Sequence, residues 1–283
     1  MTALDRASWR PARDEELTWF RAGGVLPSRP RPLEYSCEIA ALTWGLTQAF
    51  TISYWPLYEL RSSLIDGQLY LGVAPSPHAE GDLENRKRLT TETPLRYTRN
   101  IRAAWERGGR REVEDYTERM AAFPPAGVDG EELGEAFFKL RRVRADQWCA
   151  PSRAVICPAV ICTLGSGETP VDVAMEVARE ARDLIGRGGA AFDAALNRAG
   201  ERLAQAGCID AAADVAWLEY SEVRAALELP SKYQATVRER QARAESIMAA
   251  PGAGTVGPPL PPDAPRMYLV RDVLELVGVE LAR

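Results

Sequence analysis

Apolar residues along much of this chain recur at intervals of three and four, the spacing that lines one face of a helix. The clearest run is Phe192, Ala195, Leu196, Ala199, Leu203 and Ala206. Gly207 follows this run, at the position where a left-handed glycine commonly ends a helix. Just upstream, Thr169, Pro170 and Asp172 predict a helix start, and Val173, Val177, Ala181 and Leu184 predict its inner face.

The same period predicts helices elsewhere in the chain. The expected inner faces are Ile39, Leu42, Leu46 and Phe50; Val113, Tyr116, Met120 and Phe123; and Leu133, Phe137 and Leu140. Beyond Gly207, Ser221 is expected to cap a short helix through Leu227, and a long helical arm follows Pro230. The basic run Arg141, Arg142 and Arg144 is interpreted as a solvated helix end.

Extended structure is expected in few places. Asp66 and Gly67 predict a turn before an apolar strand at 68–73, and 155–162 and 214–218 also have an extended pattern. The apolar segment AVICPAVICTLG at 154–165 fits either a buried helix interrupted at Pro158 or two extended pieces, and the sequence does not decide between them. The predicted fold class is mainly α, a multi-helix domain with a minor β component.

Shifts in composition predict four regions. Residues 1–31 are polar and are interpreted as an N-terminal extension. A helical substrate-binding domain is expected over 32–249, a Pro- and Gly-rich linker over 250–265, and a C-terminal helical tail over 266–283.

Composition and charge narrow the class of protein. Of the 283 residues, 46% are hydrophobic and 27% charged, which is typical of a soluble globular protein. The net charge is only −5 and basic residues alternate with acidic ones, so a nucleic-acid-binding stripe is not expected. The sequence shows neither an apolar run long enough to cross a bilayer nor an apolar signal core, which predicts a cytoplasmic protein.

Cysteine and histidine usage argues against a zinc site. The five cysteines (Cys37, Cys149, Cys157, Cys162 and Cys208) are scattered, and the chain has one histidine. A structural zinc ion requires four nitrogen or sulfur ligands at characteristic spacing. The cysteines are therefore expected to be buried free thiols, and no metal ligand is assigned.

Three segments carry a resemblance to a known family. The helix LNRAGERLAQAGCI precedes a D-V-x-x-L-x-x-x-E-V pattern, made here by Asp214, Val215, Leu218, Glu222 and Val223. A P-L-x-x-S pattern is made by Pro32, Leu33 and Ser36. A G-x-L-Y-L-N strand is matched by Gly67, Leu69, Tyr70 and Leu71, with Gly72 in place of the asparagine. Together they resemble the central region of phosphoenolpyruvate-utilising phosphotransferases, a family that includes phosphoenolpyruvate synthase, rifampin phosphotransferase and phenylphosphate synthase.

The resemblance implies a substrate-binding region without the ATP-binding and phosphohistidine domains. It implies that a separate ATP-binding protein and a separate phosphohistidine carrier would complete a split enzyme, with ATP and Mg²⁺ bound on a partner and no cofactor on this chain. Since no G-x-x-x-x-G-K-[ST] loop is present, the chain alone should not turn over ATP. The alternative is a stand-alone small-molecule-binding protein, or a repurposed enzyme that has lost phosphotransfer.

Candidate site residues follow from the residues and from the resemblance. Trp44, Tyr54, Trp55 and Tyr70 either pack in the core or form an aromatic wall around a flat organic ligand. Arg179 and Arg182, three apart on one helix, resemble a pair of basic residues that faces the transferred phosphate in the family, or they form ordinary surface pairs with Glu176 and Glu180. His78 lies in a loop and is either a bystander or the candidate catalytic group for proton transfer.

Overall fold

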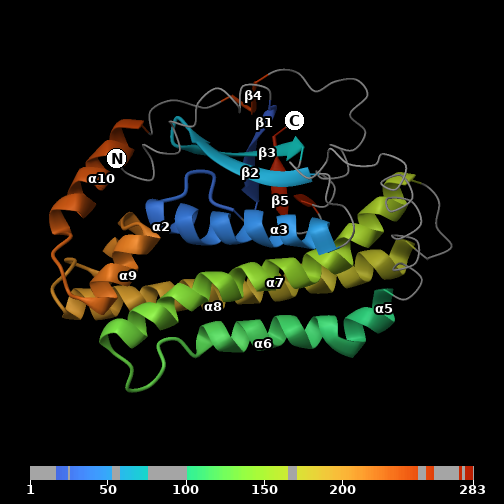
Figure 1. Cartoon of the computed structure of the whole chain (residues 1–283). Helices are drawn as coiled ribbons and strands as arrows, with labels where there is room; N and C mark the ends of the chain where they lie inside the picture. The colour runs from blue at the N-terminus through green and yellow to red at the C-terminus, as the bar shows by residue number, and fades with distance from the viewer. Residues whose placement is uncertain are drawn as a thin grey trace.

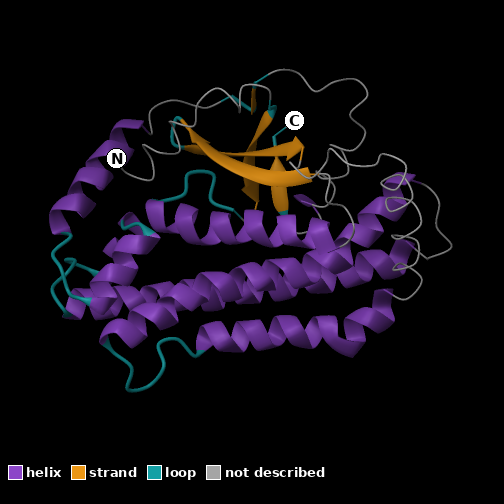
Figure 2. Ribbon diagram, viewed as in Figure 1, coloured by secondary structure: helices purple, strands orange, loops and turns teal. Residues whose placement is uncertain are grey.

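A computed structural model describes residues 17–24, 26–52, 58–75, 101–164, 171–247, 253–257, 274–275 and 278–282 (Figure 1). Two helices of 35 residues each, α7 (Gly130–Leu164) and α8 (Val171–Gln205), lie side by side along the length of the molecule. The described part of the chain is mainly helical with one small antiparallel sheet, which confirms the predicted fold class (Figure 2).

Shorter helices surround this pair. A continuous helical stretch is formed by α2 (Pro32–Glu34), a π-helical turn (Tyr35–Ile39) and α3 (Ala40–Ile52). A second one is formed by α5 (Ile101–Ala104), a π-helical turn (Trp105–Gly109) and α6 (Arg110–Ala121). After α8 come the 3₁₀ helix η5 (Ala212–Trp217), α9 (Tyr220–Glu228) and α10 (Gln234–Ile247).

The sheet is built around the strand nearest the N-terminus. Its strands are β1 (Trp19–Gly24), β2 (Tyr58–Ile65), β3 (Gln68–Pro75), β4 (Thr255–Val256) and β5 (Val279–Leu281). One edge of β1 pairs with β3, and the other pairs with β4 at its start and β5 at its end, all antiparallel. A two-residue turn joins β2 to β3, with Asp66 at φ 51° and Gly67 at φ 70°, the conformation that Asp-Gly favours in hairpins.

The elements stack in layers (Figure 1). The sheet covers one side of the α2–α3 stretch, and Leu60, Leu64, Leu69 and Leu71 point into the core that it shares with α3. The opposite side of α3 packs on α7, α8 lies beside α7, and α6 packs on the far side of the pair. A second core cluster, which includes Phe137, Phe192 and Leu218, joins α7, α8, η5 and α9.

Glycines allow α8 to approach α7 closely. A Cβ atom on Gly188 would lie 1.9 Å from Nε2 of the fully buried Gln147 of α7. Gln147 Nε2 donates to Thr117 Oγ1 at 2.7 Å, so its amide cannot easily move aside. Further along α8, Gly207 (φ 70°) ends the helix, and the Cys208 amide donates to the Leu203 carbonyl at 2.9 Å, as predicted for a left-handed stop.

Two of the three segments with an extended pattern are helical. Residues 155–162 belong to α7, which continues through Pro151 and Pro158 to Leu164, so the apolar segment is helical over 154–164. A proline removes one backbone hydrogen bond, and the rest of a long packed helix can tolerate that loss. Residues 214–217 lie in the 3₁₀ helix instead of a strand, because Asp214 accepts the Ala211 amide (2.9 Å) and starts a helical turn. The expectation at 68–73 is confirmed by β3.

Both ends of the described chain also differ from the expectation. Trp19–Gly24, placed in an N-terminal extension, is the strand that the other sheet strands flank. Val279–Leu281, placed in a helical tail, is strand β5, and Thr255–Val256 of the expected linker is strand β4. Short strands such as these are stabilised by pairing with a distant partner, which local periodicity does not report.

Helix α9 starts one residue before the position expected for its cap. Glu219 is the N-cap residue in place of Ser221, and its amide donates to Glu222 Oε2 at 2.7 Å.

In the part of the chain that the structure describes, no helix combines the length and apolarity needed to cross a membrane.

Candidate functional site

The predicted site residues divide into those the structure describes and those it does not. Tyr54, Trp55 and His78 lie outside the described residues. Trp44, Tyr70 and the arginine pair come from three different elements, α3, β3 and α8.

Tyr70 and Trp44 lie on different sides of the sheet. Tyr70 is 1% exposed and packs with Leu17 and Trp19 on the face of the sheet turned away from α3. Its hydroxyl donates to the Ala253 carbonyl at 2.6 Å, and burial raises its pKa. Trp44 lies on α3, half-buried against the main core. Tyr70 is therefore a core residue, and it does not form one aromatic wall with Trp44.

Arg179 and Arg182 are exposed on α8, and α3 and α7 separate that helix from the sheet (Figure 1). The neighbouring glutamates pair elsewhere: Glu176 with Arg102, and Glu180 with Arg110 at 2.8 Å. Glu180 also accepts the Trp105 indole N–H at 3.0 Å. The arginine pair therefore has no carboxylate partner among the described residues, and it does not face the aromatic residues.

A cavity of about 600 Å³ lies between α3 and α7, beside Trp44. Ala40, Ala41 and Ala145 form its small-residue floor, and Trp44 and Phe138 supply aromatic surface. Phe138 is 42% exposed, which is unusual for so large an apolar side chain. We call this the α3–α7 cavity; its volume is in the usual range for a small-molecule site.

Basic side chains dominate the rim of the α3–α7 cavity. Lys139, Arg141 and Arg142 line it together with one acidic residue, Glu135. The Arg142 guanidinium lies 4.4 Å from the centre of the Trp44 ring, a cation–π contact. Arg141 stacks 4.5 Å above Tyr220, and its Nη1 donates to the Ser36 carbonyl at 3.4 Å. Lys139 pairs with Glu135 at 3.5 Å and Arg142 pairs with Asp146 at 3.4 Å, so one net positive charge remains beside the flat apolar surface, which suits a planar anion.

A buried polar network joins α7 to the π-helical turn (Tyr35–Ile39) that precedes α3. Arg144 Nε donates to Glu38 Oε2 at 2.8 Å, and Trp148 Nε1 donates to Glu38 Oε1 at 3.2 Å. The Arg144 side chain also donates to Gln147 and to the Ile185 carbonyl of α8. The interpretation of 141–144 as a solvated helix end is therefore wrong for Arg144, which is 2% exposed in mid-helix. The signal was present in the sequence, because residue 144 falls on the helical face of Phe137 and Leu140.

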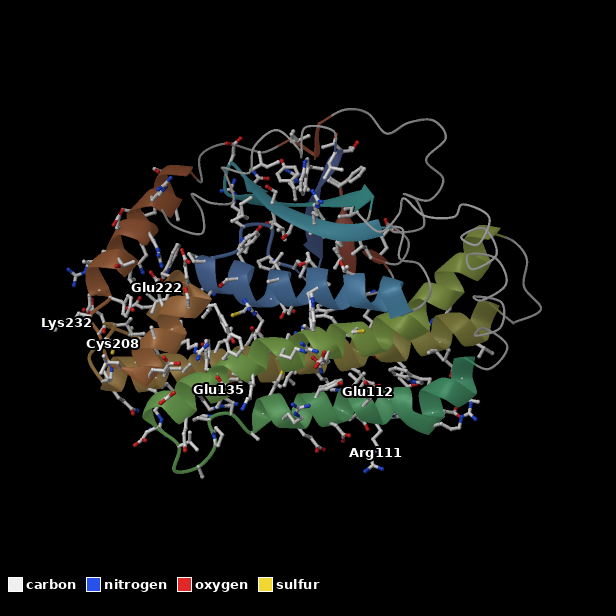
Figure 3. The ribbon with its side chains drawn as sticks, viewed as in Figure 1. Arg111, Glu112, Glu135, Cys208, Glu222 and Lys232 are labelled. Carbon is white, nitrogen blue, oxygen red and sulfur yellow. The ribbon has the colours of Figure 1, made fainter. Side chains whose placement is uncertain are left out.

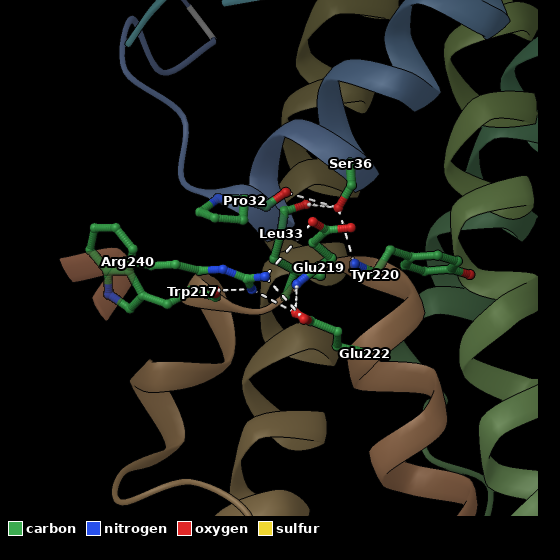
Figure 4. Close-up of polar contacts among 8 residues, drawn as sticks. All are labelled: Pro32, Leu33, Ser36, Trp217, Glu219, Tyr220, Glu222 and Arg240. Carbon is green, nitrogen blue, oxygen red and sulfur yellow. Dashed lines mark hydrogen bonds and ion pairs between the residues drawn. The ribbon is translucent and has the colours of Figure 1, made fainter. Parts of the chain in front are cut away.

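Two of the three segments that carry the family resemblance, the Pro32–Ser36 and Asp214–Val223 patterns, meet at one junction (Figure 4). Ser36 Oγ donates to the Pro32 carbonyl at 2.8 Å and accepts the Tyr220 amide at 3.3 Å. The apolar members of both patterns are buried in the same core cluster: Leu33, Val215, Leu218 and Val223. The polar members cap helices: Asp214 caps η5 and Glu222 caps α9. These patterns therefore describe how segments distant in sequence pack together, and they do not assemble a reactive group.

Arg240 of α10 completes the junction. It is 4% exposed, and it donates to Glu222 Oε1 at 3.0 Å and to the Trp217 carbonyl at 2.8 Å. Its Nη2 also lies 3.7 Å from Glu219 Oε1. The buried Nε of Arg240 has no hydrogen-bond partner. A guanidinium between two carboxylates stays charged and moves no proton, so Arg240 is a positioning residue.

Residues 252–257, GAGTVG, have the G-x-G-x-x-G spacing of a dinucleotide-binding loop. That function requires the glycines to follow a strand and open a helix. Here Thr255–Val256, within the motif, is itself strand β4, and Gly257 (φ 101°) packs against the Leu17 carbonyl. The spacing therefore serves strand packing, not phosphate binding.

The described residues offer no metal site. They contain no group of three or more His, Cys, Asp or Glu side chains that could hold a metal ion. Cys37, Cys149 and Cys208 are buried free thiols, as expected from the sequence. Burial raises the pKa of the Cys37 thiol, so this cysteine is held in its unreactive protonated form.

Comparisons with known proteins add no neighbour. A scan against protein-family models, a search of curated proteins and a search of solved structures each found no match.

Proposed function

We propose that this chain is a substrate-binding module that holds a small planar organic anion in the α3–α7 cavity. The observation that carries the proposal is the combination of Trp44 and Phe138 with three basic residues around one cavity of about 600 Å³. Aromatic surface beside arginines was expected from the sequence, with Arg179 and Arg182 of α8 as the arginines. The proposal keeps this combination but assigns it to Arg141 and Arg142 of α7, which line the cavity with Trp44.

The binding module would serve a phosphotransferase divided among several proteins. This part of the proposal rests on the resemblance to the central region of the phosphoenolpyruvate-utilising enzymes. It is supported by the meeting of the Pro32–Ser36 and Asp214–Val223 patterns at one junction, as expected of segments that belong to one structural unit. Partner proteins would supply the ATP-binding site with its Mg²⁺ and the phosphohistidine carrier, and this chain would supply the bound acceptor.

Calorimetric titration with benzoate and benzamide tests the binding site. Benzoate is a planar anion, and benzamide is its neutral counterpart of nearly the same shape. Benzoate should bind and benzamide should bind much more weakly, because the cationic rim stabilises a carboxylate. Arg142→Met should weaken benzoate binding at least about tenfold, because a charge-assisted hydrogen bond contributes about 1.5–3 kcal/mol.

The matched control is Arg111→Met. Arg111 is exposed on α6, on the opposite side of the helical layers from α3 (Figure 3). The Arg111→Met variant loses the same charge as Arg142→Met, but Arg111 does not line the α3–α7 cavity. Equal affinity of the parent for benzoate and benzamide would contradict the proposed anion site, and so would an equal loss of benzoate affinity in the two variants.

Incubation with radiolabelled ATP tests the divided enzyme. The purified chain should neither hydrolyse ATP nor acquire a phosphohistidine by itself. ATP hydrolysis that co-purifies with the chain, and is lost on substitution of one of its residues, would instead establish an independent enzyme.

A further inference from the structure

A second cavity, of about 620 Å³, lies on another side of the molecule beside α10. It is bounded by the loop that precedes α2, the tip of the β2–β3 hairpin, the end of η5 and one face of α10. We call it the α10 cavity. No residue lines both this cavity and the α3–α7 cavity, so the two can be tested separately.

The walls of the α10 cavity are largely apolar. Pro27, Pro30 and Pro32 present ring surfaces from the loop, and Trp217 contributes an aromatic side chain from η5. Proline fixes its own backbone φ angle, so this wall is formed in advance of any ligand. Preformed apolar walls with a few polar groups are typical of small-molecule sites.

The charges of the α10 cavity are opposite to those of the α3–α7 cavity. Arg31 is neutralised by Glu34, whose Oε1 accepts from Arg31 Nε at 2.9 Å. Asp66 and Glu245 also line the cavity, and neither forms a hydrogen bond or ion pair with another residue of the described chain. Arg29 also lines the cavity, so the lining holds two arginines against three carboxylates, and a net charge of −1 lies beside an aromatic ring, which favours an organic cation over an anion.

The two carboxylates come from elements that hold them in place. Asp66 is at the tip of the hairpin, where its positive φ and that of Gly67 define the turn. Glu245 lies one and four residues beyond Ala244 and Gln241 on the α10 face that lines the cavity. Arg240 on the same helix ties α10 to Glu222 and so sets the position of that face.

We infer that the α10 cavity binds a small organic monocation, an amine or amidinium with a flat apolar body. The body stacks against Trp217 and the prolines, and the positive charge lies towards Asp66 and Glu245. This site is independent of the proposed acceptor site and takes a ligand of opposite charge.

Titration with benzamidine, followed by calorimetry and by ligand-observed NMR, tests the inference. Benzamidine is a planar monocation, and benzamide is its neutral counterpart. Benzamidine should bind, benzamide should bind at least tenfold more weakly, and saturating benzoate should not displace benzamidine. Asp66→Asn and Glu245→Gln should each weaken benzamidine binding several-fold, and the double variant should weaken it further.

Glu239→Gln is the matched control, because Glu239 is exposed on the opposite face of α10 and the variant loses the same charge. It should bind benzamidine like the parent. Thermal melts of all four variants should coincide with that of the parent, since the substituted side chains are exposed. Absence of benzamidine binding, equal binding of benzamide, or a loss in Glu239→Gln equal to that in Glu245→Gln would overturn the inference.

Discussion

Arg240 of α10 donates to both carboxylate oxygens of Glu222 on α9, and this pair joins a helix with few other contacts to the body of the protein. The Arg240 side chain is 5% exposed and that of Glu222 is 25% exposed. Removing one partner of such a pair leaves the other charge without compensation in a poorly solvated position.

We therefore expect Arg240→Met to lower the free energy of unfolding by about 3 kcal/mol, as is typical when one member of a buried pair is lost. Urea denaturation followed by circular dichroism measures the change. Arg238→Met is the matched control, because Arg238 pairs with Asp210 across 3.1 Å while both side chains are more than half exposed. That pair should contribute at most about 1 kcal/mol. Similar losses in the two variants would show that the buried pair has no special role.

The close approach of α7 and α8 makes a second prediction. Gly188→Ala should destabilise the protein by about 1–3 kcal/mol, because the new methyl group overlaps the buried amide of Gln147. Gly186→Ala, two residues earlier on the same helix, adds its methyl group to open space and should stabilise by about 0.5–1 kcal/mol. Urea midpoints that move in the same direction for both variants would contradict the packing described here.

Alkaline pH tests the environment of Tyr116. Burial first, and then the charge of Glu112, raise the pKa of Tyr116 from 10.0 to about 12. The unfolded chain therefore loses this proton at lower pH than the folded protein does. The stability that Tyr116 contributes is complete below pH 10 and is lost as the pH rises towards about 12.

Urea midpoints at pH 8 and pH 11 measure this effect. The decrease between the two pH values should be smaller in Tyr116→Phe than in the parent, because the variant has no proton to lose at that position. Glu112→Gln, which removes a charge that raises the pKa, should give an intermediate decrease. If the urea midpoint falls equally in Tyr116→Phe and in the parent, the pKa of Tyr116 is not raised in the folded protein.

The arginine pair on α8 supplies a fourth prediction. Arg179→Ala and Arg182→Ala, alone or together, should leave benzoate affinity unchanged, because their helix does not line the α3–α7 cavity. Stability should change little, because both side chains are exposed. Calorimetric titration of the α8 variants with benzoate, alongside Arg142→Met and the parent, measures these affinities. A tenfold loss in the α8 variants would restore the site inferred from the sequence.

Local periodicity predicted most of the helices, but not the second half of α7 or the 3₁₀ helix η5. Val177, Ala181 and Leu184 are all buried on the inner face of α8, as their spacing required. Periodicity failed where pairing with a distant segment decides the structure. Strand β5 has only three residues, and the alternation of Val279, Glu280 and Leu281 is too short to distinguish from a helical tail without knowledge of β1.

Of the described residues that the sequence suggested for a site, Trp44 alone lines the α3–α7 cavity. Trp44 was expected either to pack in the core or to offer aromatic surface to a ligand, and basic residues line the same cavity. Which arginines join it depends on which helix packs against α3, and no local pattern contains that information. Arg142 is distant from Trp44 in sequence yet its guanidinium lies 4.4 Å from the ring.

The pairing of β1 has a consequence for the order in which this protein folds during synthesis. Trp19–Gly24 is synthesised before its partners on one edge, Thr255–Val256 and Val279–Leu281, which follow the whole helical region in the chain. The helical layers consist of segments closer together in the chain, and contacts between nearby segments form fastest. One edge of β1 therefore stays unpaired until these two late strands have been made, and such an edge can template aggregation. Its protection by a chaperone would matter more for the yield of this protein than the stability of its helices.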